Sequence, residues 1–193
     1  MQTQKALAVL VISTIVVLGF AIGFMFLTFD GETPNNHGST TSITNTIVKD
    51  VDLRNLGVQL PDWNLVLSNG SLQSLHSLRG RFVVVDLMAT WCSSCAIQNA
   101  DLKTLYNNMG DAIHIISLTV DLSETEAMMA AYVEDKDLPW PHGLDTQSVF
   151  SNYFNIQYIP SIVILDDEGF LRWFHEGLWS EAEMAETLAL LMG

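Results

Sequence analysis

The sequence predicts an α/β fold in which a central mixed β-sheet is flanked by helices on both faces and preceded by one transmembrane helix. Short runs rich in β-branched residues alternate with longer stretches that carry apolar residues at helical spacing. Near the C-terminus a hairpin pattern precedes an amphipathic stretch, a succession that favours a mixed sheet covered on both faces. Near the N-terminus a long segment carries no charged residue.

That uncharged segment, residues 6–29, is long enough to cross a membrane. At about 1.5 Å per residue, a helix of this length spans a hydrocarbon core of roughly 30 Å. Lys5 precedes it and Asp30 follows it, so the positive-inside rule predicts a cytoplasmic N-terminus at residues 1–5 and an extracytoplasmic remainder, single-pass in the cell membrane. A cleaved signal peptide is the alternative, but the segment is long for one and shows no small-x-small site near its end.

Residues 30–57 are rich in Gly, Ser, Thr and Asn, a composition that predicts a flexible linker. We therefore expect the folded domain to span residues 58–193. At its start, residues 63–67 are a strand candidate and Asn69-Gly70 is a strong turn signal. Asn69 also stands in a glycosylation sequon, a pattern that is common by chance, so modification there stays open.

The net charge of −14 bears on partners rather than on fold. The phosphates of nucleic acids repel such an acidic chain, so no nucleic acid is expected as a partner. Anionic lipid surfaces repel it too, so we expect the chain to attach to the membrane through its own apolar helix.

The centre of the sequence combines a strand, a turn and a helix with a pair of cysteines. Residues 83–85 are three valines and predict a buried strand, and residues 97–106 carry apolar side chains at helical spacing. Cys92 and Cys95 stand at C-x-x-C spacing where this helix should begin. A helix N-terminus has unpaired N–H groups and a partial positive charge, which favour a thiolate. We expect Cys92 to be the exposed attacking sulfur and Cys95 the inward resolving one.

The remaining elements follow from capping and turn signals. Ser123-Glu124-Thr125-Glu126 has the pattern of a capping box and predicts the start of a helix that runs to about Lys136. Residues 180–183 predict in the same way the start of a final helix that ends near Leu191. The other expected elements are strands at residues 112–120, 161–165 and 170–175, a helix at 146–154 and a hairpin turn at 166–169. His114, in the first of these strands, is interpreted as a packed residue rather than a catalytic base.

Four motifs make this chain resemble the thioredoxin superfamily, and residues 58–193 resemble its membrane-tethered, extracytoplasmic TlpA/ResA-like branch. The motifs are Pro61-Asp62-Trp63, Leu75 to Gly80 (LHSLRG), Asp86 to Cys95 (DLMATWCSSC) and Ile159-Pro160-Ser161. The resemblance implies a thioredoxin-like fold and a redox-active disulfide between Cys92 and Cys95. It implies no metal and no organic cofactor.

The resemblance also implies roles for four further residues. Asp86 stands in an apolar run, where burial raises the pKa of a carboxyl, and matches the buried aspartate that accepts the proton of Cys95. An aspartate at a strand end, bonded to backbone, is the alternative. Most X-Pro bonds are trans, but in the family the proline that matches Pro160 is cis and lies beside the two sulfurs. The backbone of Ile159 would pair with an extended substrate, and Trp91 would be a partly exposed contact surface.

Two departures, at Ser93-Ser94 and at Gln98, limit what carries over from the family. Ser93-Ser94 between the cysteines differs from thioredoxin and from the TlpA/ResA branch, so the reduction potential is not inherited. Gln98 stands where many cytochrome-maturation members have a glutamate, which weakens an assignment to apocytochrome reduction. Trp140 and His142 lie in the insertion that shapes partner choice, and we expect them on a recognition surface.

These observations predict a membrane-anchored extracytoplasmic thiol–disulfide oxidoreductase that reduces disulfides of cysteine-containing protein substrates, with cytochrome c maturation as one setting. Reduction would require a transmembrane thiol electron donor. A disulfide oxidant or isomerase is the alternative direction. A peroxiredoxin would need a peroxidatic cysteine in another motif. A Sco-like copper chaperone, the alternative of another class, uses C-x-x-x-C and a distant histidine; the spacing here is one residue short, although His142 is present.

Overall fold

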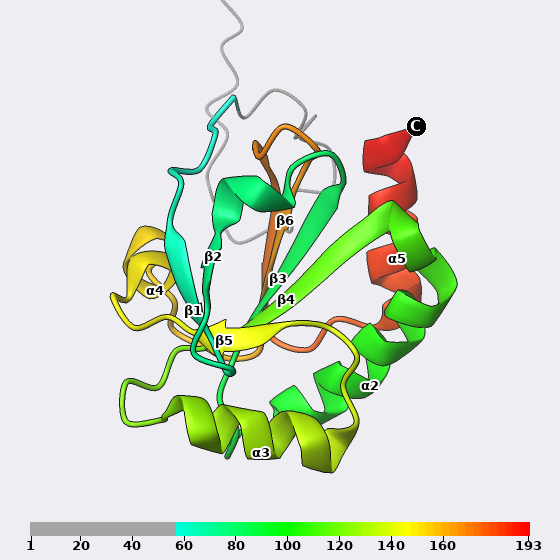
Figure 1. The fold of residues 1–193 in the computed structure, drawn as a ribbon. Helices are drawn as coiled ribbons and strands as arrows, with labels where there is room; N and C mark the ends of the chain where they lie inside the picture. The colour runs from blue at the N-terminus through cyan, green and yellow to red at the C-terminus, as the bar shows by residue number, and fades with distance from the viewer. Residues whose placement is uncertain (1–56) are drawn as a thin grey trace, which may run out of the picture. The chain divides into compact units, whose positions relative to one another are not determined.

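The computed structural model describes residues 57–193 (Figure 1). The predicted cytoplasmic N-terminus (1–5) and transmembrane anchor (6–29) lie outside the described residues, as does the predicted linker (30–57) apart from Gly57. Within the described part, no helix is both long enough and apolar enough to cross a membrane.

A seven-stranded mixed sheet forms the centre of the described region, in the order β2-β1-β5-β4-β3-β6-β7. Pairing of β3 with β4 and of β4 with β5 is parallel, and the other pairings are antiparallel. The strands are β1 (Asn64–Leu67), β2 (Leu72–Ser74), β3 (Phe82–Met88), β4 (Ile113–Thr119), β5 (His142–Leu144), β6 (Ser161–Leu165) and β7 (Leu171–Glu176). In the interior of the sheet, β3 therefore lies between a parallel neighbour, β4, and an antiparallel neighbour, β6.

Helices cover both faces of this sheet, as predicted (Figure 1). The helices α2 (Ser93–Met109), α3 (Glu126–Lys136) and α5 (Glu181–Met192) pack on one face, and α4 (Val149–Tyr153) and the 3-10 helix η2 (Leu75–Leu78) pack on the other. A short 3-10 helix, η3 (Gly110–Ala112), joins α2 to β4. Because side chains alternate along a strand, Val84 and Met88 of β3 join the α2 core and Val85 joins the opposite one.

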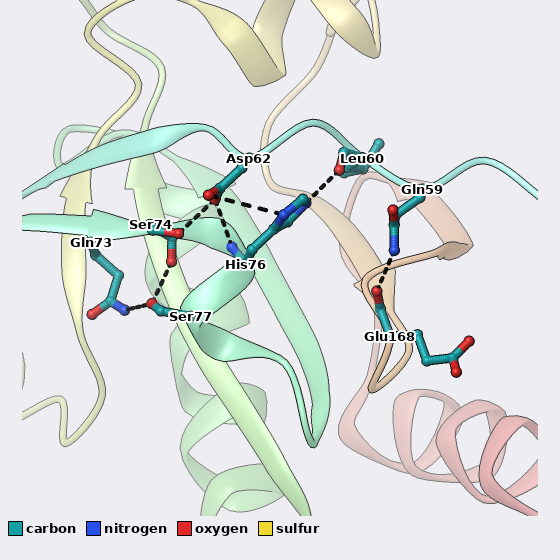
Figure 2. A network of polar contacts seen from close by, with 8 residues as sticks. All are labelled: Gln59, Leu60, Asp62, Gln73, Ser74, His76, Ser77 and Glu168. Atoms are coloured by element: carbon teal, nitrogen blue, oxygen red, sulfur yellow. Dashed lines mark hydrogen bonds and ion pairs between the residues drawn. The ribbon is translucent and has the colours of Figure 1, made fainter.

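Polar contacts fasten the start of the domain to the edge of the sheet (Figure 2). The carboxylate of Asp62 accepts hydrogen bonds from Ser74 Oγ at 2.6 Å and from the backbone N–H of His76 at 2.9 Å. These bonds lower the pKa of Asp62 below its usual value. His76 Nε2 lies 2.8 Å from the carbonyl oxygen of Leu60, and Gln59 Nε2 donates to the carbonyl of Glu168. The Pro61-Asp62-Trp63 motif therefore has an anchoring role here.

Several local predictions are wrong in detail. Thr125 caps α3 by accepting a hydrogen bond from Met128 N, so the predicted capping box at Ser123 is wrong. The carboxylate of Glu124 instead accepts hydrogen bonds from Thr90. The capping box at Ser180 is confirmed. The predicted helix at 146–154 is reduced to α4, and β2 and β5 were not predicted because three residues show no periodicity. Gly143 lets β1 approach β5, since a Cβ there would clash with the carbonyl oxygen of Val66.

Candidate active site

Cys92 and Cys95 form a disulfide at the N-terminus of α2, with their Cα atoms 5.2 Å apart. Cys92 is the N-cap residue, and its Sγ accepts a hydrogen bond of 3.1 Å from the backbone N–H of Cys95. The predicted helix start at Cys92 is confirmed. Cys92 is only 6% exposed, however, and Cys95 is fully buried, so the expectation of a well-exposed Cys92 is wrong in degree. The order of access is as predicted.

The Ile159–Pro160 peptide bond is cis, as the resemblance implied, and lies beside the disulfide. The carbonyl oxygen of Ile159 is 4.0 Å from Cys92 Sγ. Ser94 Oγ donates to the same carbonyl at 3.4 Å and lies 3.3 Å from Cys92 Sγ. Ser94, which the sequence marked only as a departure from the family, therefore joins the attacking sulfur to the cis-proline loop.

Asp86 lies in the middle of β3, fully buried, on the face that α2 covers. Its Oδ2 accepts a hydrogen bond of 2.8 Å from Ser117 Oγ, whereas its Oδ1 has no hydrogen-bond partner. Burial raises the pKa of Asp86 to about 7, and the bond from Ser117 opposes that rise. The alternative of an aspartate at a strand end bonded to backbone is wrong. The structure therefore contains a buried carboxyl that can take up or release a proton near neutral pH.

Trp91 is 68% exposed and is held by its indole N–H, which donates to Asp121 Oδ2 at 2.7 Å. The preceding residue is fixed by Glu124, whose Oε1 accepts from Thr90 N at 2.9 Å and from Thr90 Oγ1 at 2.6 Å. Glu124 is buried, and its Oε2 has no partner. Sequence reasoning missed this carboxylate because its position in a capping pattern favoured a local role. It holds the loop that leads into Cys92.

Gln98 connects α2 to the segment before α5. Its Nε2 donates to the carbonyl of Trp179 at 2.8 Å, and its Oε1 accepts from the N–H of Trp179 at 2.8 Å. This reciprocal pair is buried, and Nε2 also lies 3.8 Å from Met184 Sδ. The amide therefore satisfies one backbone donor and one backbone acceptor, which a carboxylate could not do.

Trp140 and His142 do not form a recognition surface. Both are buried, at 3% and 2% exposure, so that prediction is wrong. The insertion folds back as β5 and places the indole in the core under α2 and α3, because an apolar ring of this size gains most from burial.

His114 is half-buried, as expected, and burial lowers its pKa. Within residues 57–193 no group of three or more His, Cys, Asp and Glu side chains is placed to hold a metal ion.

The arrangement has the parts that dithiol chemistry needs. A helix N-terminus and a backbone N–H both face Cys92 Sγ, which favours negative charge on that sulfur. The second sulfur is covered, and a carboxyl with a raised pKa lies on the same face of the sheet. The aromatic ring of Trp91 stands exposed beside the pair.

Comparisons with known proteins agree with this geometry. A family model described as Redoxin matches residues 55–188. The chain is 27% identical over 135 residues to the thioredoxin-like protein YneN of Bacillus subtilis, covering 69% of this chain and 79% of that protein. It is 24% identical over 121 residues to the thiol-disulfide oxidoreductase ResA of Bacillus cereus, covering 62% of this chain and 69% of that protein.

Solved structures show the same fold at lower identity. StoA from Bacillus subtilis matches with a TM-score of 0.56 and 16% identity, over 65% of this chain and 95% of that chain. The exposed lipoprotein thioredoxin Etrx1 from Streptococcus pneumoniae matches with a TM-score of 0.60 and 21% identity, over 67% of this chain and 99% of that chain. The predicted thioredoxin-like fold and the resemblance to the TlpA/ResA-like branch are confirmed.

Proposed function

The chain belongs to the Redoxin family and is a thiol–disulfide oxidoreductase, and we propose that it reduces disulfides of partner proteins through Cys92 and Cys95. The observation that carries the proposal is the placement of the pair: one sulfur caps α2 and accepts a backbone N–H, and the other is buried one turn further along. This asymmetry separates an attacking sulfur from a resolving sulfur.

The reaction proceeds in two exchanges. The Cys92 thiolate attacks one sulfur of a partner disulfide, forms a mixed disulfide and releases the other partner sulfur as a thiolate. Cys95, after losing its proton, attacks Cys92 Sγ, which releases the second partner thiolate and leaves the Cys92–Cys95 disulfide. Two electrons pass from the dithiol to the partner, and the final state is the one that the structure contains.

Asp86 is the residue that we assign to the proton of Cys95. A general base works best when its pKa is near the operating pH, and burial brings the pKa of Asp86 to about 7. An ordinary aspartate would be too weak a base. Asp86 also lies on the side of β3 that is covered by α2, the helix that carries Cys95, and this position supports the assignment.

Exposed apolar side chains near the pair support a polypeptide substrate. Trp91 precedes Cys92, Leu122 follows the aspartate that holds the Trp91 indole, and Tyr158 precedes the loop that touches Cys92. All three are at least 67% exposed. Exposed aromatic and aliphatic groups of this kind are typical of protein-binding surfaces. Trp91 would contact the partner, and the backbone of Ile159 beside cis-Pro160 would pair with its extended chain.

The cellular setting that we propose follows from the sequence. Residues 6–29 would anchor the chain in the cell membrane, with residues 58–193 on the extracytoplasmic side. Regeneration of the dithiol would then require a transmembrane thiol electron donor. Cytochrome c maturation is one setting for such a reductase, although Gln98 replaces the titratable residue of many members that act there.

Reduction of insulin by the full chain, with dithiothreitol as electron source, tests the proposed chemistry. Cys92→Ser should abolish exchange, because it removes the attacking sulfur. Cys95→Ser should stop after the first exchange and accumulate a mixed disulfide, visible as a mass increase that a reductant removes. Full activity in Cys92→Ser would refute the mechanism.

Tight copper binding by the reduced chain, lost in His142→Ala, would favour the copper-chaperone alternative instead.

A further inference from the structure

A row of polar side chains crosses the three central strands of the sheet on the face that α2 and α3 cover. The register places Asp86 of β3 opposite Ser117 of β4, and Ser117 opposite His142 of β5. Paired residues of neighbouring strands lie on the same face, so these three side chains share the face covered by α2 and α3. All three are at most 2% exposed. Polar residues buried this deeply require hydrogen-bond partners, so their contacts identify their role.

Two consecutive hydrogen bonds end at the carboxyl of Asp86. Trp140 Nε1 donates to Ser117 Oγ at 2.9 Å, and Ser117 Oγ donates to Asp86 Oδ2 at 2.8 Å. A serine hydroxyl has one hydrogen, and an indole N–H can only donate. Because the indole N–H of Trp140 donates to one lone pair of Ser117 Oγ, the hydroxyl hydrogen is free to be donated to Asp86.

His142 holds the indole in place from the other end of the row. Its Nδ1 lies 2.8 Å from the carbonyl oxygen of Trp140, and the two rings stack at 5.5 Å between centroids. A carbonyl only accepts, so Nδ1 carries the hydrogen and the unpartnered Nε2 does not. Burial lowers the pKa of His142 to about 4, so the ring is neutral at physiological pH. It supports Trp140 without adding charge near Asp86.

Among the described residues, Ser117 is the only one that donates a hydrogen bond to the side chain of Asp86. The other titratable groups on this face of the sheet come from α2 and α3. On the same side of the sheet, Cys95 of α2 lies in the core and is held in the disulfide. From α3 comes Tyr132, whose hydroxyl accepts from Asn99 Nδ2 at 2.8 Å and whose pKa is raised mainly by burial. Within residues 57–193 no Lys or Arg forms an ion pair with the carboxyl.

We propose that Ser117, oriented by Trp140, is a positioning residue that sets how firmly Asp86 holds its proton, and hence the pH at which Cys95 can resolve the mixed disulfide. The inference rests on the proposed role of Asp86 in the exchange reaction. A hydrogen bond donated to the ionised carboxylate stabilises that form, whereas burial stabilises the protonated form. Ser117 therefore keeps a deeply buried carboxyl able to ionise near neutral pH. The insertion that carries Trp140 acts on the chemistry through this contact rather than through the surface.

A carboxyl titration of the oxidised full chain tests the proposal without using activity. The probe is the side-chain carbon signal of ¹³C-labelled aspartate, with the Asp86 signal identified by its loss in Asp86→Asn. Ser117→Ala should move the midpoint of Asp86 to higher pH by roughly one unit or more, because the ionised form loses its donor. Ser117→Thr keeps the hydroxyl and should restore the wild-type midpoint. Trp140→Phe keeps a ring but loses the N–H, and should shift the midpoint in the same direction by less.

A second readout separates this inference from the proposed function. In single-turnover reactions, the pH profile for resolution of the mixed disulfide should shift with the Asp86 midpoint in Ser117→Ala, while formation of the mixed disulfide by Cys92 keeps its wild-type rate. A wild-type midpoint in both Ser117→Ala and Trp140→Phe would overturn the inference and leave the exchange chemistry intact. A shifted midpoint with an unchanged resolution profile would also overturn it. Failure of the proposed function would appear separately, as exchange that survives in Cys92→Ser.

Discussion

The backbone N–H of Cys95 donates a hydrogen bond of 3.1 Å to Sγ of Cys92, so the buried cysteine helps to stabilise charge on its partner. The bond exists because Cys92 occupies the N-cap position of α2, where serine, threonine or aspartate oxygens usually accept from the first helical turn. A sulfur in this place also faces the positive end of the helix. The two cysteines are therefore chemically different although only two serines separate them.

The first prediction follows from this difference. In the reduced full chain at pH 7, iodoacetamide should modify Cys92 faster than Cys95 by roughly tenfold or more, because the thiolate is the reactive form and Cys95 is fully buried. Timed alkylation followed by peptide mass spectrometry measures both rates. Denatured chain is the control, in which the rates should converge. Equal rates in the folded chain would contradict the assignment of Cys92 as the attacking sulfur.

The second prediction concerns the pH dependence of stability. Burial brings the pKa of Asp86 to about 7 in the folded chain, against 3.8 for the exposed group. Between these pH values the folded chain holds a proton that the unfolded chain has released, so the free energy of unfolding falls as pH rises through this window. Above it, both states are ionised and the loss is complete. Asp86→Asn should therefore be more stable than wild type at pH 8, by roughly 2–4 kcal/mol.

Urea unfolding of the oxidised chain at pH 4.5 and pH 8 measures this difference. Asparagine keeps an oxygen that can accept from Ser117, so the comparison isolates the charge. The stability gap between Asp86→Asn and wild type should be several-fold smaller at pH 4.5, close to the pKa of the unfolded group, than at pH 8. A gap of the same size at both pH values would show that Asp86 does not titrate in this range.

Patterns that extend over many residues were predictable from the sequence. The apolar run of β3, the helix start at Cys92 and the burial of Asp86 each follow from residue types within one continuous segment. The cis bond before Pro160 could be predicted only from the family resemblance, since most X-Pro bonds are trans. Most of the fold and the placement of Cys92, Cys95 and Asp86 could therefore be predicted from local periodicity and capping patterns.

Contacts between distant segments were not predictable in this way. Glu124 accepts hydrogen bonds from Thr90 rather than capping its own helix, and Trp140, just before β5, donates to Ser117 of the neighbouring strand β4. Both choices depend on which elements become neighbours in the folded sheet, and the three-residue β5 that brings Trp140 inward has no periodic signal. A buried polar partner is visible only once the sheet order is known, because sequence distance does not indicate proximity.

The third prediction concerns Gln98. Replacing it with glutamate keeps the shape, but the ionised carboxylate cannot donate to the carbonyl of Trp179 and is a buried charge. Gln98→Glu should lower the free energy of unfolding by roughly 1–3 kcal/mol, with a larger loss at pH 8 than at pH 5, where the new carboxyl can be protonated. Asn107→Asp adds the same charge at an exposed position of α2 and is the matched control. An unchanged melting temperature in Gln98→Glu would contradict the structural role assigned to this amide.

The fourth prediction concerns substrate contact at Trp91. Trp91→Ala should raise KM for reduction of a protein disulfide several-fold, because a large exposed ring at the centre of an interface contributes strongly to binding. The reaction with a small disulfide such as oxidised glutathione should change less, since it buries little of the ring. Leu72→Ala removes a side chain of equal exposure on the edge strand β2 and should leave both reactions unchanged. Equal losses for the large and the small substrate would instead indicate damage to the site.

The fifth prediction decides the direction of electron flow. The reduction potential of the Cys92–Cys95 pair is measured in the full chain by equilibration across a glutathione series, followed by alkylation and mass spectrometry. A reductase fed by a membrane thiol donor should have a potential below roughly −220 mV, so that the dithiol gives up electrons readily. The backbone N–H on Cys92 stabilises the thiolate of the reduced form, which by itself favours a higher potential. A value above about −180 mV would reverse the proposed direction and assign the chain to disulfide oxidation or isomerisation.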